Sequence, residues 1–529
     1  MTAVLFISMV ILLFAGVPIA FVLGGSSVLA LAADSGTNMS IVIQRMFSGT
    51  GSFTLLAIPF FVLAGNLMSS GGISRRLVSL CNSFLGHIPG GLAMVAVATC
   101  AFFAAISGSS AATAAAVGAI IVPEMLKHKY DRNFAAGTIA SSAELGVIIP
   151  PSIGLIQYGV AAEQSIGDLF KAGFLPGLFI CGTIMAMAHH LAKKQGFVPV
   201  EKASWAERGK AFKDAILAIL MPVIILGGIY GGIFTPTEAA AVSVVYGLFV
   251  GMVIYREVSI RDMFDILVDS AKTTGGIMLI VASASLFSFV CTKFGIADAA
   301  SNLLGSIAHN QFTFLLIVNV IFLIAGCFID ANSAMYIFIP IMLPVCKQLG
   351  YDVVAFGIVA TVNLAIGQVT PPVGVNLFVA ISVKLKNGEK VDIPQISKAV
   401  MPMIVASVIV LAAITYVPSI STFLPKALAG DGAYTGNPTV SSDNGSSSLD
   451  EENAAAFNDI DDYSDLGWEE QTWNFTCSTT ETSTWADGGR KFGELMEKAT
   501  GGKVKVAVYA ADQLTGGNQS EGIQALMNG

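Results

Sequence analysis

The chain has 529 residues, of which 54% are hydrophobic and 12% are charged. Soluble domains carry about 25% charged residues, so this composition predicts that most of the chain lies in a lipid bilayer. The net charge of −8 is divided unevenly, because residues 1–427 carry +4 and residues 428–529 carry −12. No nucleophile with a base and an orienting partner, no phosphate-binding loop and no basic nucleic-acid patch emerges, which argues against an enzyme or a nucleic-acid-binding protein.

Apolar segments follow one another along residues 1–427, and a spanning helix needs about 20 such residues. The candidates in the first half, residues 1–210, are 3–15 with 17–33, 53–70, 91–127, 133–163 and 168–190. The candidates in the second half, residues 211–427, are 214–232, 236–255, 273–292, 311–347, 352–384 and 395–425. Short amphipathic stretches at 72–86, 259–272 and 295–308 lie between them, either as helices along the membrane interface or as ordinary connecting helices.

Segments 91–127 and 311–347 are too long for a single span. The first is interrupted by Ser107-Gly108-Ser109-Ser110 and the second by Asp330-Ala331-Asn332. Small and polar residues in the middle of an apolar run predict a re-entrant helical hairpin whose tip ends inside the membrane. The alternative is one long tilted helix followed by a short one.

Residues 123–151 and 344–372 resemble each other at a fixed offset of 221 positions. The coinciding residues are Pro123/Pro344, Tyr130/Tyr351, Asp131/Asp352, Gly146/Gly367, Pro150/Pro371 and Pro151/Pro372. Chance matches in an Ala/Leu/Val-rich chain would be apolar, so we infer an internal duplication. Each Pro-Pro pair breaks a helix, in segments 133–163 and 352–384. Broken helices at matching positions of two halves indicate the substrate and ion site of a transporter.

Loop charges predict the topology of the two halves. With five crossings and one hairpin in each half, and both termini outside, the inside loops collect 18 Lys and Arg residues and the outside loops five. This bias is the one that the positive-inside rule requires. An odd number of crossings per half also inverts the second repeat relative to the first. The arrangement depends on counting residues 3–33 as two crossings.

The last hundred residues have a different pattern. Residues 428–470 are acidic and rich in Ser, Gly and Asn, which predicts a flexible linker. From Trp473 onward, the sequence predicts a strand at WNFTCS, a helix at 485–498 and a strand at 503–510. This order is typical of an α/β domain, of which residues 471–529 are too few to close the fold.

The tips and breaks supply the candidate sodium and substrate site. Its residues in the first half are Ser107, Gly108, Ser109, Ser110, Gly146, Pro150, Pro151 and Ser152. Its residues in the second half are Asp330, Ala331, Asn332, Gly367, Thr370, Pro371 and Pro372. Free carbonyls and hydroxyls at helix ends suit a hard cation such as Na⁺, whereas the alternative is close helix packing through small residues. His and Cys show no metal-ligand spacing, so no cofactor and no other metal are expected, and an ion gradient is the expected driving force.

Single polar residues in apolar segments are further candidates. Asp330 is expected to ligate or neutralise a cation, or to take up a proton during transport. Glu144 either has such a role or satisfies backbone groups freed by the break at Pro150. Glu238 is expected to cap the start of a helix. The secondary candidates for the site are Glu144, Asn363, Gln368 and Asn376.

Four segments together resemble the large membrane subunit of the TRAP (tripartite ATP-independent periplasmic) transporters: GSSAATAAAVGAIIVPEM, SSAELGVIIPPS, FIDANSAMYIFIPIMLPV and QVTPPVGVNLFVA. The resemblance covers essentially residues 1–427 and includes both tips and both Pro-Pro breaks. The end of the chain, from KFGELMEKATGG onward, resembles the opening lobe of the family's periplasmic solute-binding subunit. A fusion of the two fits a C-terminal tail that lies outside.

The resemblance implies an all-α polytopic protein of the bacterial inner membrane, with an inverted repeat, two re-entrant hairpins, an elevator mechanism and a truncated α/β tail in the periplasm. It implies Na⁺-coupled uptake of an organic acid, such as a C4-dicarboxylate. A periplasmic solute-binding protein would deliver this substrate, and a separate small membrane subunit would complete the scaffold. By position, the sodium ligands would be Ser107, Ser109, Ser110, Gly146 and Pro150 in the first repeat, and Asp330, Asn332, Gly367 and Thr370 in the second.

The tail departs from the family in two ways. It ends before the arginine that, in the family, clamps the substrate carboxylate, so this tail by itself is not expected to capture substrate. It also lacks a secretion signal of its own. The alternative function is a stand-alone Na⁺/dicarboxylate symporter of similar architecture that needs no binding protein. A membrane-anchored receptor, a third possibility, would have no need of two broken-helix repeats.

Overall fold

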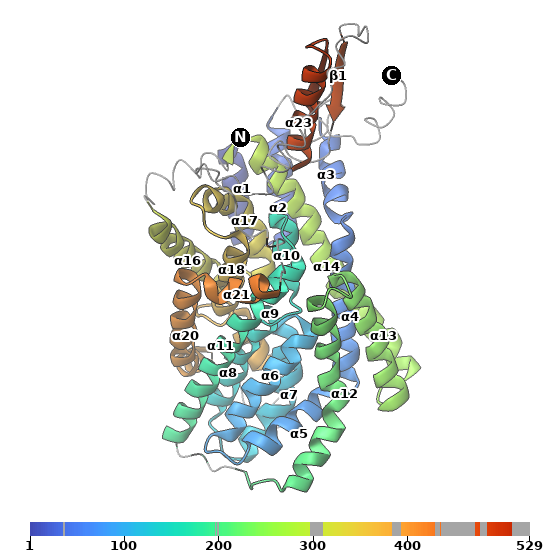
Figure 1. Ribbon diagram of the computed structural model, residues 1–529. Helices are drawn as coiled ribbons and strands as arrows, with labels where there is room; N and C mark the ends of the chain where they lie inside the picture. Colours follow the sequence, from blue (N-terminus) through green and yellow to red (C-terminus); the bar gives the residue numbers. More distant parts are fainter. Residues whose placement is uncertain are drawn as a thin grey trace. The chain divides into compact units, whose positions relative to one another are not determined.

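The computed structural model describes residues 1–34, 38–195, 197, 200–296, 310–382, 393–428, 434, 471–476 and 484–509. The chain divides into two compact units. The first, which we call the membrane unit, comprises Met1–Thr37 and Arg45–Thr439. The second, which we call the tail unit, comprises Asn38–Gln44 and Val440–Gly529. Figure 1 shows the membrane unit as a bundle of helices.

The first half of the chain is helical nearly throughout (Figure 1). Its helices are α1 Thr2–Phe14, α2 Ile19–Ala32, α3 Ser40–Thr50, α4 Ala57–Ser70, α5 Ile73–Leu85, α6 Gly91–Ser107, α7 Ser110–Lys127, α8 Arg132–Ala143, α9 Leu145–Ile148, α10 Ile153–Ala162 and α11 Ile166–Lys194. A 3-10 turn, η1 Phe53–Leu56, leads into α4. Segment 91–127 is therefore two helices, α6 and α7, which pack against each other.

The second half of the chain is also helical nearly throughout. Its helices are α12 Trp205–Tyr230, α13 Pro236–Leu248, the π-helical turn η2 Phe249–Ile254, α14 Ile260–Lys293, α16 Gln311–Phe328, α17 Ala331–Gln348, α18 Val353–Gly367, α19 Val375–Ser382, α20 Ile393–Tyr416 and α21 Ser419–Leu428. A capping box of Ser204 and Glu207 starts α12. The expected repeat boundary at residue 210 therefore falls inside this helix, and not between two helices.

The membrane unit has the helices of a multi-pass membrane protein. Within the described ranges, eight helices are long and apolar enough to cross a bilayer. The pair Arg132–Ile148 and Ile153–Ala162, bent by 41°, makes up to nine. Helices α1 and α2 pack against each other but have only 13 and 14 residues, so each is shorter than an average span. Pro18 and Gly16, at φ +75°, separate them.

The region 259–293 differs from its prediction. The sequence predicts an amphipathic stretch at 259–272 and a separate span at 273–292, but α14 is one continuous helix of 34 residues. Ser259 and Asp262 form a capping box that starts the helix. The polar first turns are compatible with a helix because Asp269 and Lys272 pair along it at 3.4 Å. Polarity here marks a helix that extends beyond the apolar segment, and not a break.

The internal duplication appears as equivalent bonds in the two halves. Asp131 caps α8 by accepting from Phe134 N–H, and Asp352 caps α18 by accepting from Ala355 N–H, each at 2.9 Å. These donors and acceptors are both 221 positions apart. The peptide bonds Pro150-Pro151 and Pro371-Pro372 are both cis. The conserved spacing in the sequence therefore corresponds to the same local structure, built twice.

The tail unit contains a short βαβ element. Strand β1, Gln471–Thr476, pairs in parallel with strand β2, Val504–Tyr509, and the register aligns Gln471 with Val504. Helix α23, Thr484–Ala499, connects the two strands and packs against β2. The predicted linker at 428–470 lies outside the described residues except for Leu428 and Tyr434, as do most of the predicted amphipathic stretch at 295–308 and residues 510–529 of the predicted lobe.

Candidate functional site

The first tip is built from one glycine and three serines. Gly108 ends α6 at φ +62°, a conformation that glycine adopts without strain. Ser109 then caps α7 by accepting from Ala112 N–H at 3.5 Å. Thr113 Oγ1 donates to the Ser109 carbonyl at 2.8 Å and lies 3.0 Å from Ser107 Oγ. The tip therefore gathers hydroxyls around two helix ends.

The first break lies directly against this tip. Ser152 caps α10, and its hydroxyl also donates to the Val147 carbonyl at 2.5 Å. The Ile153 N–H donates to the Gly108 carbonyl at 3.2 Å, which joins break and tip. A Cβ added at Gly146 would lie 2.6 Å from the Ser109 carbonyl oxygen. Glycine is thus required where the two backbones touch.

The second tip and break repeat this contact. Gly374, 221 positions after Ile153, donates its N–H to the Cys327 carbonyl at 3.0 Å. Gly326 and Gly367 touch, since a Cβ at Gly367 would lie 2.6 Å from Gly326 Cα. Thr370 Oγ1 donates to the Ile366 carbonyl at 2.8 Å, just before the cis bond at Pro371-Pro372.

A side-chain hydrogen bond joins the candidate sites of the two repeats. Ser110, in the first tip, donates to Gln368 Oε1, in the second break, at 2.6 Å. Helices of each half pack against the other half. Helix α10 of the first half contacts α17 and α18, and helix α19 of the second half contacts α7 and α8. Tyr158, on α10, donates to the Val353 carbonyl at 2.6 Å. The site residues of both halves thus belong to one interlocked body.

Asp330 occupies the start of α17, as a capping residue does. It accepts from Ser333 N–H at 3.1 Å and from Ser333 Oγ at 2.5 Å. Its neighbours Ala331 and Asn332 form the first turn, and Asn332 Oδ1 is buried without a hydrogen-bond partner among the described residues. Of Asp330, Ala331 and Asn332, it is Asn332 whose side-chain oxygen has no hydrogen-bond partner among the described residues.

The secondary candidates divide into two groups. Gln368 and Asn376 lie at the second break, where Asn376 N–H donates to the Gln368 carbonyl at 3.0 Å. Asn363 instead donates to Asn319 Oδ1 of α16 at 2.7 Å. Glu144 accepts from Ser407 Oγ of α20 at 2.7 Å, whereas the freed backbone carbonyl of Val147 is taken by Ser152. No group of three or more His, Cys, Asp or Glu suited to a metal occurs in the described part of the chain.

Two residues of the site region, Ser407 and Gln157, were not singled out in the sequence. Ser407 is the partner of Glu144, and only the tertiary structure brings α20 to α8. Gln157, on α10, is fully buried, and both ends of its amide lack a partner among the described residues. Asn376 has the same property. A polar amide six positions after a Pro-Pro break in an apolar helix is the signal that would have drawn attention to Gln157.

Comparisons with known proteins agree with this architecture. Residues 6–420 match the family described as "Tripartite ATP-independent periplasmic transporter, DctM component". The C4-dicarboxylate TRAP transporter large permease protein DctM of Rhodobacter capsulatus is 37% identical over 439 residues, 80% of this chain and 99% of its own. The sialic acid TRAP transporter large permease protein SiaM of Vibrio cholerae is 38% identical, over 80% of this chain and 97% of its own.

A further relative and a solved structure complete the comparison. The isethionate TRAP transporter permease protein DctMQ of Oleidesulfovibrio alaskensis is 41% identical over 79% of this chain and 66% of its own length. The crystal structure of the Alcanivorax borkumensis YdaH transporter has a similar fold, with a TM-score of 0.52 at 14% identity over 73% of this chain and 88% of its own. Because the family match covers most of the chain, the chain belongs to the DctM family, the large membrane component of the tripartite ATP-independent periplasmic transporters.

Proposed function

We propose that this chain is the permease of a sodium-coupled uptake system for a small organic anion. The observation that carries the proposal is the duplicated contact of a tip with a broken helix, joined between the halves by Ser110 and Gln368. Matching broken helices in two halves form the substrate and ion site of secondary transporters. Relatives are named for C4-dicarboxylates, sialic acid or isethionate, all of them organic anions.

Sodium ions are assigned to the two tip–break contacts as co-transported substrate. Hard cations prefer oxygen ligands, and each contact offers backbone carbonyls with hydroxyl groups beside them. Ser107, Ser109 and Thr370 supply hydroxyls, and Gly146 and Gly367 allow the backbones to come close enough for their carbonyls to share an ion. The C-terminal ends of the helices at the tips and breaks carry a partial negative charge, which favours the binding of a cation.

The organic anion is assigned to the polar space beside these ions. Gln157 and Asn376 bring buried amide groups, and Asn332 brings a buried amide oxygen, that have no partner among the described residues. Buried polar groups without a partner are costly, so water or a polar ligand is expected to complete their hydrogen bonds. Amide donors and hydroxyls would hold the anion, and the sodium ions would balance its charge.

The transport movement is proposed to be of the elevator type. In this proposal, α6–α7 and α16–α17 are re-entrant hairpins that move together with the broken helices. Helices α4, α12, α13 and α14 form the scaffold, supported by contacts of α4 with α13 and α14. Helix α5 packs on both α12 and α6, as expected for an arm between the moving and the static part. A small membrane subunit and a periplasmic solute-binding protein are the proposed partners, and the tail unit is proposed to be the beginning of a binding lobe fused to the permease.

Uptake into proteoliposomes tests the proposal. The permease is reconstituted with a small subunit and a solute-binding protein from a relative, and radiolabelled succinate, sialic acid and isethionate are offered in turn. We expect accumulation of at least one anion under an inward sodium gradient, and none when potassium or choline replaces sodium. Equal uptake in sodium-free buffer would refute the coupling. Uptake of none of the three anions, by a preparation that is folded and correctly oriented, would contradict the proposed substrate class.

A further inference from the structure

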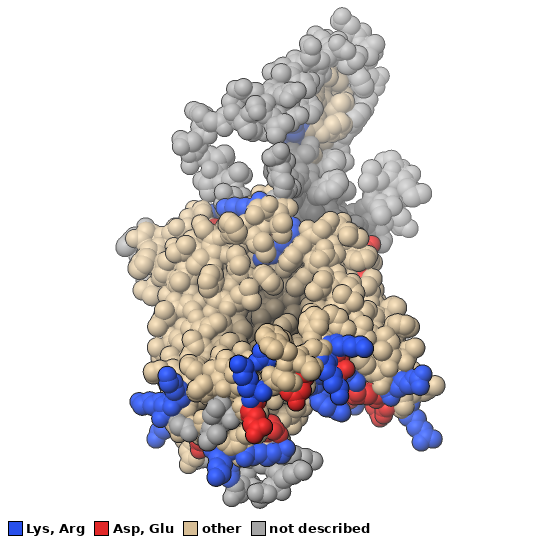
Figure 2. All heavy atoms as spheres, turned by 60° about the horizontal axis from the view of Figure 1, so that its bottom comes forward, with Lys and Arg blue, Asp and Glu red and all other residues tan. Residues whose placement is uncertain are grey.

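A polar cavity of about 550 Å³ lies apart from the transport site. Three elements line it: α5 with Arg75 and Arg76, α12 with Lys213 and Asp214, and the segment after η2 with Tyr255 and Glu257. Figure 2 shows that Lys and Arg gather on the face of the membrane unit that points downward in Figure 1, the end at which α5 lies and α12 begins. The cavity is thus formed near the basic end of the bundle.

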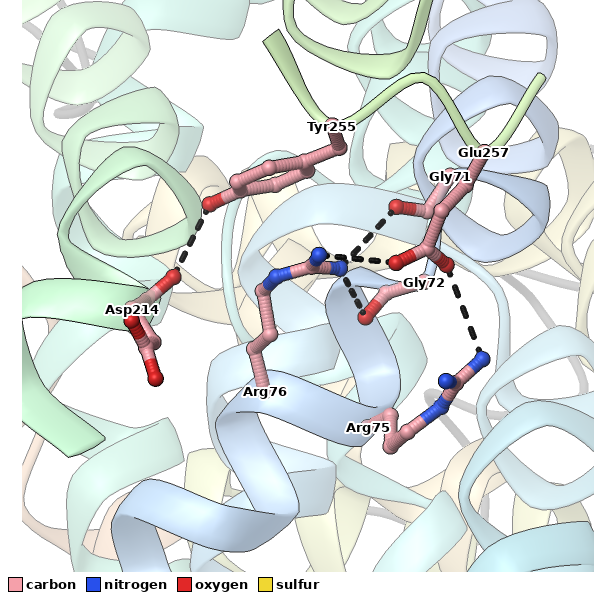
Figure 3. Close-up of polar contacts among 7 residues, drawn as sticks. All are labelled: Gly71, Gly72, Arg75, Arg76, Asp214, Tyr255 and Glu257. Carbon is pink, nitrogen blue, oxygen red and sulfur yellow. Dashed lines mark hydrogen bonds and ion pairs between the residues drawn. The ribbon is translucent and has the colours of Figure 1, made fainter. Parts of the chain in front are cut away.

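Arg76 is fixed by contacts on every side. Its guanidinium lies 2.7 Å from Glu257 Oε1 and donates to the carbonyls of Gly72 at 3.0 Å and Gly71 at 3.4 Å. The same group lies 3.6 Å from the centroid of the Tyr255 ring (Figure 3). Tyr255 is itself held by the bond from its hydroxyl to the Asp214 carbonyl at 3.0 Å. These contacts hold the Arg76 guanidinium in place in the lining of the cavity, and the Glu257 carboxylate balances its positive charge.

Arg75 and Lys213 are the cations left for a ligand. The Arg75 side chain is 74% exposed and reaches Glu257 only at 3.5 Å, a carboxylate that Arg76 already occupies. Lys213 is exposed and has no ion pair or hydrogen bond within the described ranges. The remaining acid is Asp214, whose side chain is drawn away from both guanidinium groups in Figure 3. Arg75, whose ion pair with Glu257 is long, and Lys213, unpaired among the described residues, make the cavity suitable for an anion.

The opposite wall of the cavity is apolar. Leu217 and Ile254 line it, and Ile254 is 45% exposed. Leu220, one turn beyond Leu217 on α12, and Val253, the residue before Ile254 in η2, are exposed apolar residues as well. Exposed apolar side chains on membrane-spanning helices face lipid. A ligand that fits both walls has an anionic head and an apolar body.

We propose that this cavity binds the headgroup of an anionic phospholipid. Arg75 and Lys213 contact the phosphodiester, and the acyl chains lie along Leu220 and Val253. Basic pockets between transmembrane helices are suited to such headgroups. The bound lipid joins the arm helix α5 to α12 and to η2, in addition to the ion pair of Arg76 and Glu257. A free phosphate shares the head chemistry but makes no use of the apolar wall.

Native mass spectrometry of the purified full chain tests the proposal. Phosphatidylglycerol and phosphatidylcholine with identical acyl chains are titrated separately, and inorganic phosphate is added as a competitor. We expect phosphatidylglycerol to bind about tenfold more tightly than phosphatidylcholine. Both lipids carry the phosphodiester, but the quaternary ammonium of choline cancels its charge and is repelled by Arg75 and Lys213, whereas glycerol brings no positive charge. Displacement of the lipid by inorganic phosphate at equal concentration would overturn the proposal, because the ligand would then be a soluble anion.

Matched variants locate the binding to this cavity. The double variant Arg75→Ala/Lys213→Ala is expected to lose the preference for phosphatidylglycerol. The charge-preserving variant Arg75→Lys/Lys213→Arg is expected to keep most of it. The control Lys194→Ala/Arg261→Ala removes the same charge from exposed positions that do not line the cavity, and its preference should equal that of the unchanged chain. An unchanged preference in the first variant, or an equal loss in the control, would overturn the proposal.

Discussion

At the scale of single residues, the candidate site has glycines at positions where a side chain would collide with neighbouring backbone. Gly146 touches the backbone of the first tip, Gly367 touches the backbone of Gly326 in α16, and Gly108 adopts a positive φ at the end of α6. Backbone atoms cannot move aside as the end of a flexible side chain does. The glycines of the duplicated segments are therefore explained by close approach of backbone to backbone, which also exposes carbonyls to the same small space.

Gly146→Ala tests this close approach. The new Cβ would lie 2.6 Å from the Ser109 carbonyl oxygen and 2.8 Å from Ser110 N, so the tip must shift. Overpacking of this kind costs about 1–3 kcal/mol, and we expect a lower melting temperature and a strongly raised sodium requirement for uptake. Gly182→Ala is the control, because a Cβ there meets no atom within 4 Å. If both variants need the same sodium concentration as the unchanged chain, Gly146 does not shape an ion site.

At the scale of helices, side-chain caps determine where the elements begin. Asp131 and Asp352 start the two broken helices, and Ser109 and Ser152 start the helices that follow the first tip and break. Capping boxes start α12, α13 and α14. The prediction that Glu238 caps a helix is confirmed, because it accepts from Thr235 N–H at 2.8 Å. Caps therefore position the tips as well as α12, α13 and α14.

Asp330 and Glu238 are both capping carboxylates, which allows a matched comparison. Loss of either cap costs about 1 kcal/mol, so Asp330→Ala and Glu238→Ala should lower stability similarly. We expect Asp330→Ala to reduce sodium-driven uptake far more, since Asp330 lies at a tip and Glu238 does not. Asp330→Asn retains a capping oxygen but removes the charge, so its uptake separates the two roles. Equal uptake in the two alanine variants, measured at equal amounts of folded protein, would contradict the ranking.

At the scale of the whole molecule, helices of each half pack against the other half and hold the two halves together. The helix after each break packs on the other half, with α10 on α17 and α18 and α19 on α7 and α8. Loss of one half would therefore remove packing partners from the other half's site. Ser110 and Gln368 add a hydrogen bond across the halves, between the first tip and the second break.

The orientation of the halves is testable across α11. This helix has 29 residues, so it is about 43 Å long and exceeds a hydrocarbon core of about 30 Å. Loop charges place its Lys194 end inside and its start outside. In a cysteine-free background, Glu163→Cys should react with a membrane-impermeant maleimide added to intact cells, and Lys194→Cys only after lysis. Both residues are exposed in the structure. Labelling of both, or of Lys194→Cys alone, from outside would show the predicted topology to be wrong.

Much of the fold could be read from the sequence because membrane segments obey short-range rules. Apolar length predicts the spans, and Pro-Pro pairs predict the breaks, since proline removes a backbone donor wherever it stands. The duplicated segments are also a local signal, and the structure gives them equivalent caps and contacts. The interpretation of residues 259–272 as a separate element was wrong, because a change of polarity alone does not end a helix that has a cap and no breaker.

The sequence by itself determined the membrane class, the repeat and the residues at the tips and breaks, because these follow from composition and backbone chemistry near each residue. Only the tertiary structure decided which of these residues meet. The bond between Ser110 and Gln368 joins positions 258 residues apart, and that between Ser407 and Glu144 joins positions 263 apart. No periodicity in the sequence predicts either of these two contacts. Such contacts depend on how helices exchange partners between the halves, which is fixed by side-chain packing over the whole bundle.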